Sequence, residues 1–140
     1  MGLMFPKPAR GSGLLEREAA DHARKLHERK VGEDVRRRDV RCRWPEDHTC
    51  RGGALEAAHI VNKSLGGETS TENELLLCPW MHRRGPETLH GAQLKIEKES
   101  PAGANGPLSF WKQDGGFDAL GQPTYFCVAR ERSVGLVERD

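Results

Sequence analysis

The spacing of apolar residues predicts an α-helix in the first quarter of the chain. Between residues 14 and 30 (LLEREAADHARKLHERK), apolar side chains recur at helical spacing on one face, namely at Leu15, Ala19, Ala23 and Leu26. Acidic residues early in this stretch suit the first turn of a helix, and Gly32 is typical of a helix end. We therefore expect a helix that stops at Gly32.

The middle of the chain predicts two strands and a helix. Residues 55–61 (LEAAHIV) form a short, mostly apolar run that is typical of a buried strand. A polar segment with two glycines, residues 62–70, predicts a turn or loop, and ELLLC at 74–78 predicts a second strand. Pro79 suits the start of a helix that would end before Gly85. The expected order is strand, loop, strand, helix.

The last third of the chain predicts a further sheet. Residues 100–107 are rich in Pro, Gly and Asn and predict a loop, and short β-type runs around Gly-rich turns follow. We expect these runs to form a peripheral β segment packed on the core. The chain of 140 residues is one domain with extended ends. It divides into an N-terminal arm and helix, a core and a C-terminal β extension, at residues 1–35, 36–99 and 100–140.

Composition narrows the functional classes. Hydrophobic residues make up 36% and charged residues 31% of the chain, with a net charge of +1. A nucleic-acid binder that works through bulk positive charge is excluded, so any such binding depends on local patches. No stretch approaches the roughly 20 apolar residues that span a bilayer, and the first residues lack the apolar run of a secretory signal. We therefore expect a cytoplasmic protein without a membrane partner.

Arginines gather after the predicted helix. Three acidic residues lie among them, which leaves a local excess of three positive charges. The arginines are Arg36, Arg37, Arg38, Arg41, Arg43 and Arg51. Such a segment is either a solvated charged loop or a surface that grips phosphates.

Three polar residues stand out in the centre: His59, Asn73 and His82, in the pattern H-x13-N-x8-H. Together with the Gly-Gly pair and nearby cysteines, this pattern resembles the HNH (ββα-metal) nuclease family, closest to its phage-type members. The stretches that carry the resemblance are RRRDVRCRWP, LEAAHIV and GGETSTENELLLCPWMH, and it covers residues 36–90.

The resemblance implies a fold, a reaction and a set of roles. The fold would be α+β, with a small treble-clef-like ββα-metal core. The activity would be endonucleolytic hydrolysis of DNA, with one Mg²⁺ or Mn²⁺ ion and products that carry 5′-phosphate and 3′-hydroxyl ends. His59 would be the general base, Asn73 would fix its loop and His82 would be the helix-borne metal ligand. His90 would contact the phosphate or act as a second ligand or acid, or it is a loop histidine without either role.

The chain departs from the family at its metal ligand. The family usually has Asp or His just before the base, and here that position is Ala58. Because side chains alternate along a strand, Glu56 is the carboxylate on the face where a ligand is expected. Glu56 is either that metal ligand or a surface residue in an ion pair.

The cysteines suggest a second, structural metal. Cys42, Cys50 and Cys78 offer three thiolates, and His48 could complete a tetrahedral Cys₃His zinc site. The alternative is that these cysteines are packed or exposed thiols without zinc. Cys127 lies far away in sequence and is expected to be a core residue.

Two functional hypotheses result. The first is a metal-dependent HNH endonuclease acting on DNA, with phage packaging proteins as further candidate partners. The second is a catalytically inactive, zinc-containing module that binds nucleic acid or a partner protein. In either case the candidate contacts to the DNA backbone are Arg36, Arg37, Arg38, Arg41, Lys63, Arg83 and Arg84. The alternative for each of them is a solvated surface charge without a role in binding.

Overall fold

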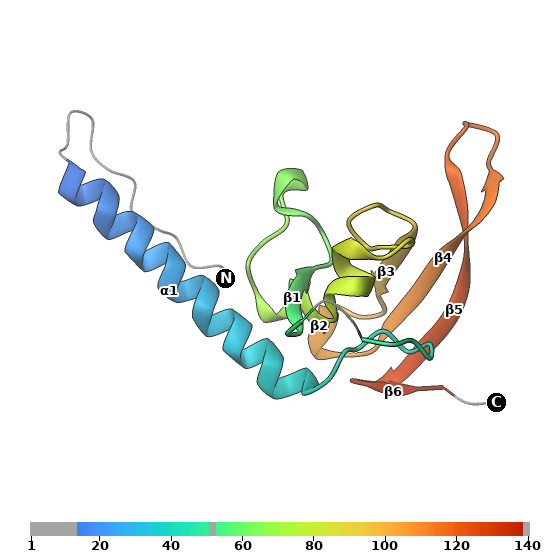
Figure 1. Cartoon of the computed structure of the whole chain (residues 1–140), viewed down its shortest axis with the longest axis horizontal. Coiled ribbons are helices and arrows are strands. Elements are labelled where there is room, and N and C mark those ends of the chain that lie inside the picture. Colours follow the sequence, from blue (N-terminus) through green and yellow to red (C-terminus); the bar gives the residue numbers. More distant parts are fainter. Residues whose placement is uncertain (1–13, 51–52, 139–140) are drawn as a thin grey trace.

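A computed structural model describes residues 14–50 and 53–138, which form one long helix and two antiparallel sheets (Figure 1). The expected α+β class is confirmed. The first sheet pairs β1 with β2, and the second has the order β3-β4-β5-β6. The main elements are α1 (Leu14–Asp39), β1 (Glu56–His59), β2 (Glu74–Leu77), β3 (Leu94–Lys98), β4 (Leu108–Phe117), β5 (Pro123–Ser133) and β6 (Leu136–Val137).

Helix α1 is longer than its sequence predicts, and the expected stop at Gly32 is wrong. The helix continues to Asp39, so Arg36, Arg37 and Arg38 lie in its last turn, where they complement the helix dipole. A glycine in a helix interior costs about 1 kcal/mol relative to alanine. Val31 and Val35, on either side of Gly32, pack against Leu76 of β2 and offset this cost. Tertiary packing therefore overrides the local stop signal.

The first half of α1 is largely exposed. Leu15 is 80% exposed and Leu26 is 44% exposed, so the apolar face expected from their spacing is not covered by the described residues. The buried residues of α1 are Val31, Gly32 and Val35. In Figure 1 the N-terminal half of the helix extends away from the rest of the molecule. No helix in the described part of the chain has the length and apolar character needed to cross a membrane.

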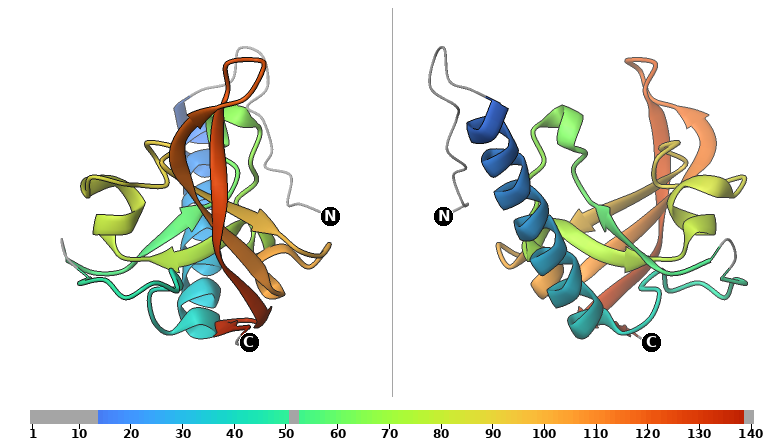
Figure 2. Two further views of the ribbon diagram at one scale, coloured as in Figure 1. Left: turned by 90° about the vertical axis from the view of Figure 1, so that its right-hand side faces the viewer. Right: turned by 60° about the vertical axis from the view of Figure 1, so that its left-hand side comes forward.

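The β1–β2 hairpin lies between two layers. One face of the hairpin carries Ala58, Leu75 and Leu77, which pack in the main core with residues of the second sheet. The other face carries Leu76, which packs against α1. Helix α1 and the four-stranded sheet therefore lie on opposite sides of the hairpin (Figures 1 and 2).

The helix predicted from Pro79 is a single wide turn, η3 (Trp80–Arg84). Its closing hydrogen bond runs from the backbone N–H of Gly85 to the carbonyl of Trp80, five residues earlier, at 2.8 Å. The described structure therefore has two strands followed by one turn of π-helix. The finer prediction of a ββα-metal core is not confirmed by this arrangement.

The second sheet is part of the core at one end. Leu94 and Ile96 of β3 and Leu108 and Phe110 of β4 are buried together with residues of the first hairpin. Trp44 packs edge-on against Phe110, with ring centroids 5.3 Å apart. The C-terminal β segment, residues 100–140, was expected to be peripheral, and this expectation is wrong for the start of β4, where Leu108 and Phe110 are buried. The far end of the β4–β5 hairpin projects outward (Figure 1).

A buried ion network joins the end of α1 to the second sheet. The side chains of Asp39, Arg43 and Glu131 are at most 1% exposed. Arg43 donates two hydrogen bonds to Glu131, at 2.7 and 3.0 Å, and others to Asp39 and to the carbonyls of Ala104 and Gly106. Glu131 also accepts from the backbone N–H groups of Leu108 and Gly135, at 3.0 Å each. The charges are thus paired and nearly saturated with hydrogen bonds, as buried ions require.

We predict that Arg43→Met destabilises the protein by about 3–5 kcal/mol, because it leaves two buried carboxylates without their cation. Urea unfolding measures the change. Arg37→Met is the control: this arginine is exposed in the same stretch and should cost less than about 0.5 kcal/mol. Equal changes in the free energy of unfolding for the two substitutions would show that the buried network does not stabilise the fold more than an exposed ion pair does.

Candidate functional site

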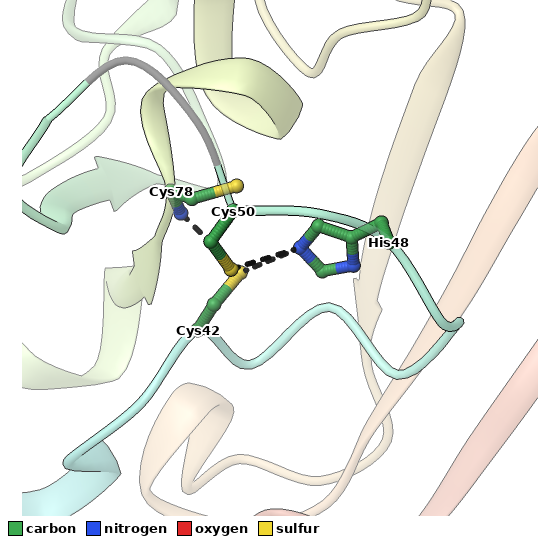
Figure 3. Close-up of side chains that lie close together, drawn as sticks. All are labelled: Cys42, His48, Cys50 and Cys78. Carbon is green, nitrogen blue, oxygen red and sulfur yellow. Dashed lines mark hydrogen bonds between the residues drawn. The ribbon is translucent and has the colours of Figure 1, made fainter.

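Four potential metal ligands gather between the segment after α1 and the end of β2. Cys42, His48, Cys50 and Cys78 place their ligand atoms within 4.8 Å of one another (Figure 3). Within residues 14–50 and 53–138, this is the group of three or more His, Cys, Asp or Glu side chains that could hold a metal ion. The residues proposed from sequence as a structural metal site are therefore brought together.

The geometry of this cluster fits tetrahedral coordination. Nε2 of His48 lies 3.5 Å from Sγ of Cys42 and 3.4 Å from Sγ of Cys50. Metal–sulfur and metal–nitrogen bonds of about 2.3 and 2.0 Å at a tetrahedral angle separate S and N by about 3.5 Å. Nδ1 of His48 lies 2.7 Å from the carbonyl of Glu46 and donates to it, which leaves Nε2 free to bind an ion. The cluster can hold a metal.

Without an ion, burial disfavours the thiolate form of Cys42 and Cys50. Burial raises the pKa of the Cys42 thiol to about 12, and burial also raises the pKa of Cys50. A bound cation reverses this tendency, because it stabilises the thiolate form. Cys127 lies outside the cluster and is half-buried in β5, where its thiol donates weakly to the carbonyl of Ala129.

A second site is a cleft of about 390 Å³ where three histidines meet. His59, His82 and His90 all line it, together with Asn62, Lys63 and Ser64. They come from the end of β1, from η3 and from the turn that follows. The rings of His82 and His90 are in edge-to-face contact, with centroids 4.7 Å apart. The structure thus brings together the histidines singled out from the sequence.

Asn73 closes the loop that follows His59. Its side-chain oxygen accepts from the N–H of Val61 at 3.0 Å, and its amide donates to the carbonyls of Val61 and Glu68 at 3.0 and 2.9 Å. Gly67 is required inside this loop, because a Cβ there would lie 1.7 Å from the carbonyl oxygen of Val61. The hydrogen bonds of the Asn73 side chain therefore fix the conformation of the loop.

Glu56 is held by Arg83 and His82. Both of its carboxylate oxygens accept from Arg83, at 2.7 to 3.2 Å, and Oε1 also accepts from Nδ1 of His82 at 2.9 Å. Hydrogen bonding by Arg83 lowers the pKa of Glu56 to about 2. Nδ1 of His82 is thereby used, and Nε2 is its remaining ligand atom. Ala58, the residue just before His59, is fully buried in the core.

The two central histidines are biased toward the neutral form. Burial lowers the pKa of His59, and the nearby Lys63 lowers it further. Burial also lowers the pKa of His82, although its hydrogen bond to Glu56 acts in the opposite direction. Imidazoles that are neutral at pH 7 can accept a proton or bind a cation.

A groove of about 540 Å³ between α1 and β1 brings basic side chains and His59 together in its lining. Lys25, Arg29, Arg36 and Lys63 line it, as does His59. Sequence reasoning did not single out Lys25 and Arg29. The sequence could have indicated them, because positions 25, 29, 32 and 36 lie on one face of a helix.

Three acidic residues also line this groove, but they leave part of its positive charge free. Glu28 pairs with Lys63 at 3.0 Å, and Glu56 pairs with Arg83. Glu74 is buried, and burial raises its pKa to about 7. Lys25, Arg29 and Arg36 have no ion-pair partner in the described residues. Considering residues 14–50 and 53–138 alone, the groove presents three cations without an ion pair.

Not all of the candidate phosphate contacts lie on the surface. The guanidinium of Arg38 donates to Asp39, to the side chain of Asn105 and to the carbonyls of Thr71 and Glu74. Its side chain is 15% exposed, so Arg38 is used internally. The candidates Arg36, Arg37, Arg41, Lys63, Arg83 and Arg84 are exposed. Arg51 lies outside the described residues.

Comparison with known proteins finds no matching family model, no matching curated protein and no matching solved structure.

Proposed function

We propose that this chain is a metal-dependent endonuclease of the HNH type that hydrolyses phosphodiester bonds in DNA. The observation that supports this function is the convergence of His59, His82 and His90 on one cleft, beside a loop closed by Asn73. A neutral imidazole at the end of a rigid strand is suited to take a proton from water at pH 7.

The roles within the cleft follow from its contacts. His59 acts as the general base, and His82 offers Nε2 to a divalent cation while Glu56 holds its Nδ1. His90 lies in contact with His82 and can supply a second nitrogen ligand or contact the phosphate. Such a cation supplies charge stabilisation at the phosphate and the leaving oxygen. Nitrogen ligands favour Mn²⁺ or another transition metal over Mg²⁺, which prefers oxygen.

The α1–β1 groove is proposed as the path of the DNA backbone toward His59. Lys25, Arg29 and Arg36 are unpaired within the described residues, and they line the same groove as His59. Cations on phosphates supply affinity without sequence selectivity. The expected specificity is therefore low.

The Cys₃His cluster is proposed as a structural zinc site. Three thiolates and one imidazole in tetrahedral spacing are typical of zinc. The ion would tie the segment after α1 to the end of β2, next to η3. It would thereby support the turn that carries His82.

A second function is favoured by the position of Ala58. This side chain is fully buried where the family's ligand would stand, and Glu56 is occupied by Arg83. A zinc-containing module that binds nucleic acid without cutting it fits these two observations.

We expect His59→Ala to reduce DNA cleavage by at least about 100-fold without weakening DNA binding, because the base acts in the chemical step. The assay follows nicking of supercoiled plasmid with Mn²⁺, Mg²⁺ or EDTA, and a gel shift follows binding. His22→Ala, on the exposed part of α1, is the control. Normal cutting by the His59 variant would refute its role as base. Metal-independent binding without any cutting would favour the second function.

We expect about one zinc ion per purified chain, measured by elemental analysis. Cys78→Ser should lower the zinc content and the unfolding temperature, because a structural metal stabilises the folded state. Cys127→Ser leaves the cluster intact and should keep full zinc content. Absence of zinc from the wild-type chain, even after refolding with the ion, would show that the cysteines are thiols that do not form a zinc site.

We expect the double substitution Lys25→Ala, Arg29→Ala to lower the salt dependence of DNA affinity. If each side chain contacts one phosphate, the slope of log K against log salt falls by about 2. Arg24→Ala with Lys30→Ala removes the same charge from residues of α1 that pair with Asp21 and Asp34 instead. Equal slopes for the two double variants would exclude the groove as the DNA path.

A further inference from the structure

Two buried polar atoms without a hydrogen-bond partner lie on neighbouring residues of the hairpin. Among the described residues, the buried side-chain nitrogen and oxygen atoms that lack a partner are Nε2 of His59 and Oε2 of Glu74. These residues are directly opposed in the register of β1 and β2. An unsatisfied buried polar group costs about 1–3 kcal/mol, and such groups are rare. Their position on opposed residues points to a shared role.

Glu74 is in an unusual place for a carboxylate. It begins a strand whose other residues are three leucines, and it is only 4% exposed. It lies on the face of the hairpin that carries Leu76, and it lines the α1–β1 groove together with His59. Directly opposed residues of antiparallel strands have Cβ atoms about 4.5–5.5 Å apart. A rotation of either side chain, or one water molecule, can therefore join the two unpartnered atoms.

The neighbouring charges leave this carboxylate available to His59. The charged groups that face Glu74 are Lys63, Glu28 and Arg38. Lys63 is paired with Glu28, and Arg38 donates to the backbone carbonyl of Glu74. None of these contacts uses Oε2.

We propose that Glu74 is the positioning residue of His59, whose Nε2–H donates to the Glu74 carboxylate so that Nδ1 faces the histidine cleft. The inference rests on the proposed function, in which His59 is the base. Nε2 is buried and cannot reach a substrate, so the basic nitrogen is Nδ1. A neutral imidazole then carries its proton on Nε2, and this N–H needs an acceptor. A base oriented by a third group is a general feature of proton transfer sites.

Three variants test the pair. Glu74→Leu removes the acceptor, Glu74→Gln keeps a carbonyl oxygen in its place, and Glu72→Gln is a control at a nearby exposed residue. Imidazole ¹H–¹⁵N spectra of the full chain at pH 8 report which nitrogen of His59 carries the proton, and His59→Ala assigns the signal. We expect a slowly exchanging Nε2–H in the wild type and in the Gln and control variants, and its loss in Glu74→Leu.

Cleavage and stability give an independent readout. We expect Glu74→Leu to lower kcat by about 10- to 100-fold with little change in KM. Glu74→Gln should lower kcat less, and Glu72→Gln should leave it unchanged. The unfolding temperature of Glu74→Leu should not fall, because the change removes a buried carboxyl group that lacks a full set of partners.

Two results would overturn the inference. One is a His59 signal that is the same in Glu74→Leu and in the wild type. The other is a loss of cleavage that is matched by a loss of stability, which would indicate a structural role. If the wild-type chain cuts no DNA, the proposed function fails, and the spectra alone then decide whether the His59–Glu74 hydrogen bond exists.

Discussion

The rest of the structure depends on the buried interaction of Arg43 with Asp39 and Glu131. Its bond between Arg43 and Glu131 joins residues 88 positions apart in sequence, and the network connects the end of α1 to β5. Asp39 also accepts from the backbone N–H of Leu76 at 2.8 Å, and the N–H of Arg43 donates to the carbonyl of Leu76 at 2.8 Å. The network therefore fixes α1 against the hairpin. Both candidate sites depend on that placement.

The metal cluster and the histidine cleft are linked through η3. Cys78 lies just before this turn, and the backbone N–H of His82 donates to the carbonyl of Cys78 at 3.0 Å. An ion bound by Cys78 would hold the start of the turn, and the turn positions His82 beside Glu56. Cys42 is joined to the same point, because its sulfur accepts from the backbone N–H of Cys78. An ion in this cluster would therefore be coupled to the geometry of the cleft through a few backbone contacts.

The buried polar groups of the described residues differ in how completely their hydrogen bonds are made. Arg43 and Glu131 are buried with nearly every hydrogen bond made, which is typical of a structural ion pair. By contrast, Nε2 of the half-buried His59 and Oε2 of the buried Glu74 lack a hydrogen-bond partner among the described residues. Proteins tolerate such incomplete satisfaction mainly at functional sites, where stability is traded for chemistry. This contrast separates the supporting framework from the residues proposed to act.

The sequence by itself determined the local elements and the chemical set. The runs around 55–61 and 74–78 predicted the two strands of the hairpin. The H-x13-N-x8-H spacing marked two histidines of one cleft and the asparagine that closes the adjacent loop, and the cysteines with His48 marked a cluster that could hold a metal. Local periodicity and turn residues carry this information, since each depends on neighbours within a few positions. Only the tertiary structure decided that α1 passes Gly32, that Arg38 and Arg43 lie inside, and that Glu56 is held by Arg83. It also decided that Glu74 opposes His59. These features come from contacts between segments distant in sequence, and long-range ion pairs and buried orphan atoms leave no periodic signal in the chain.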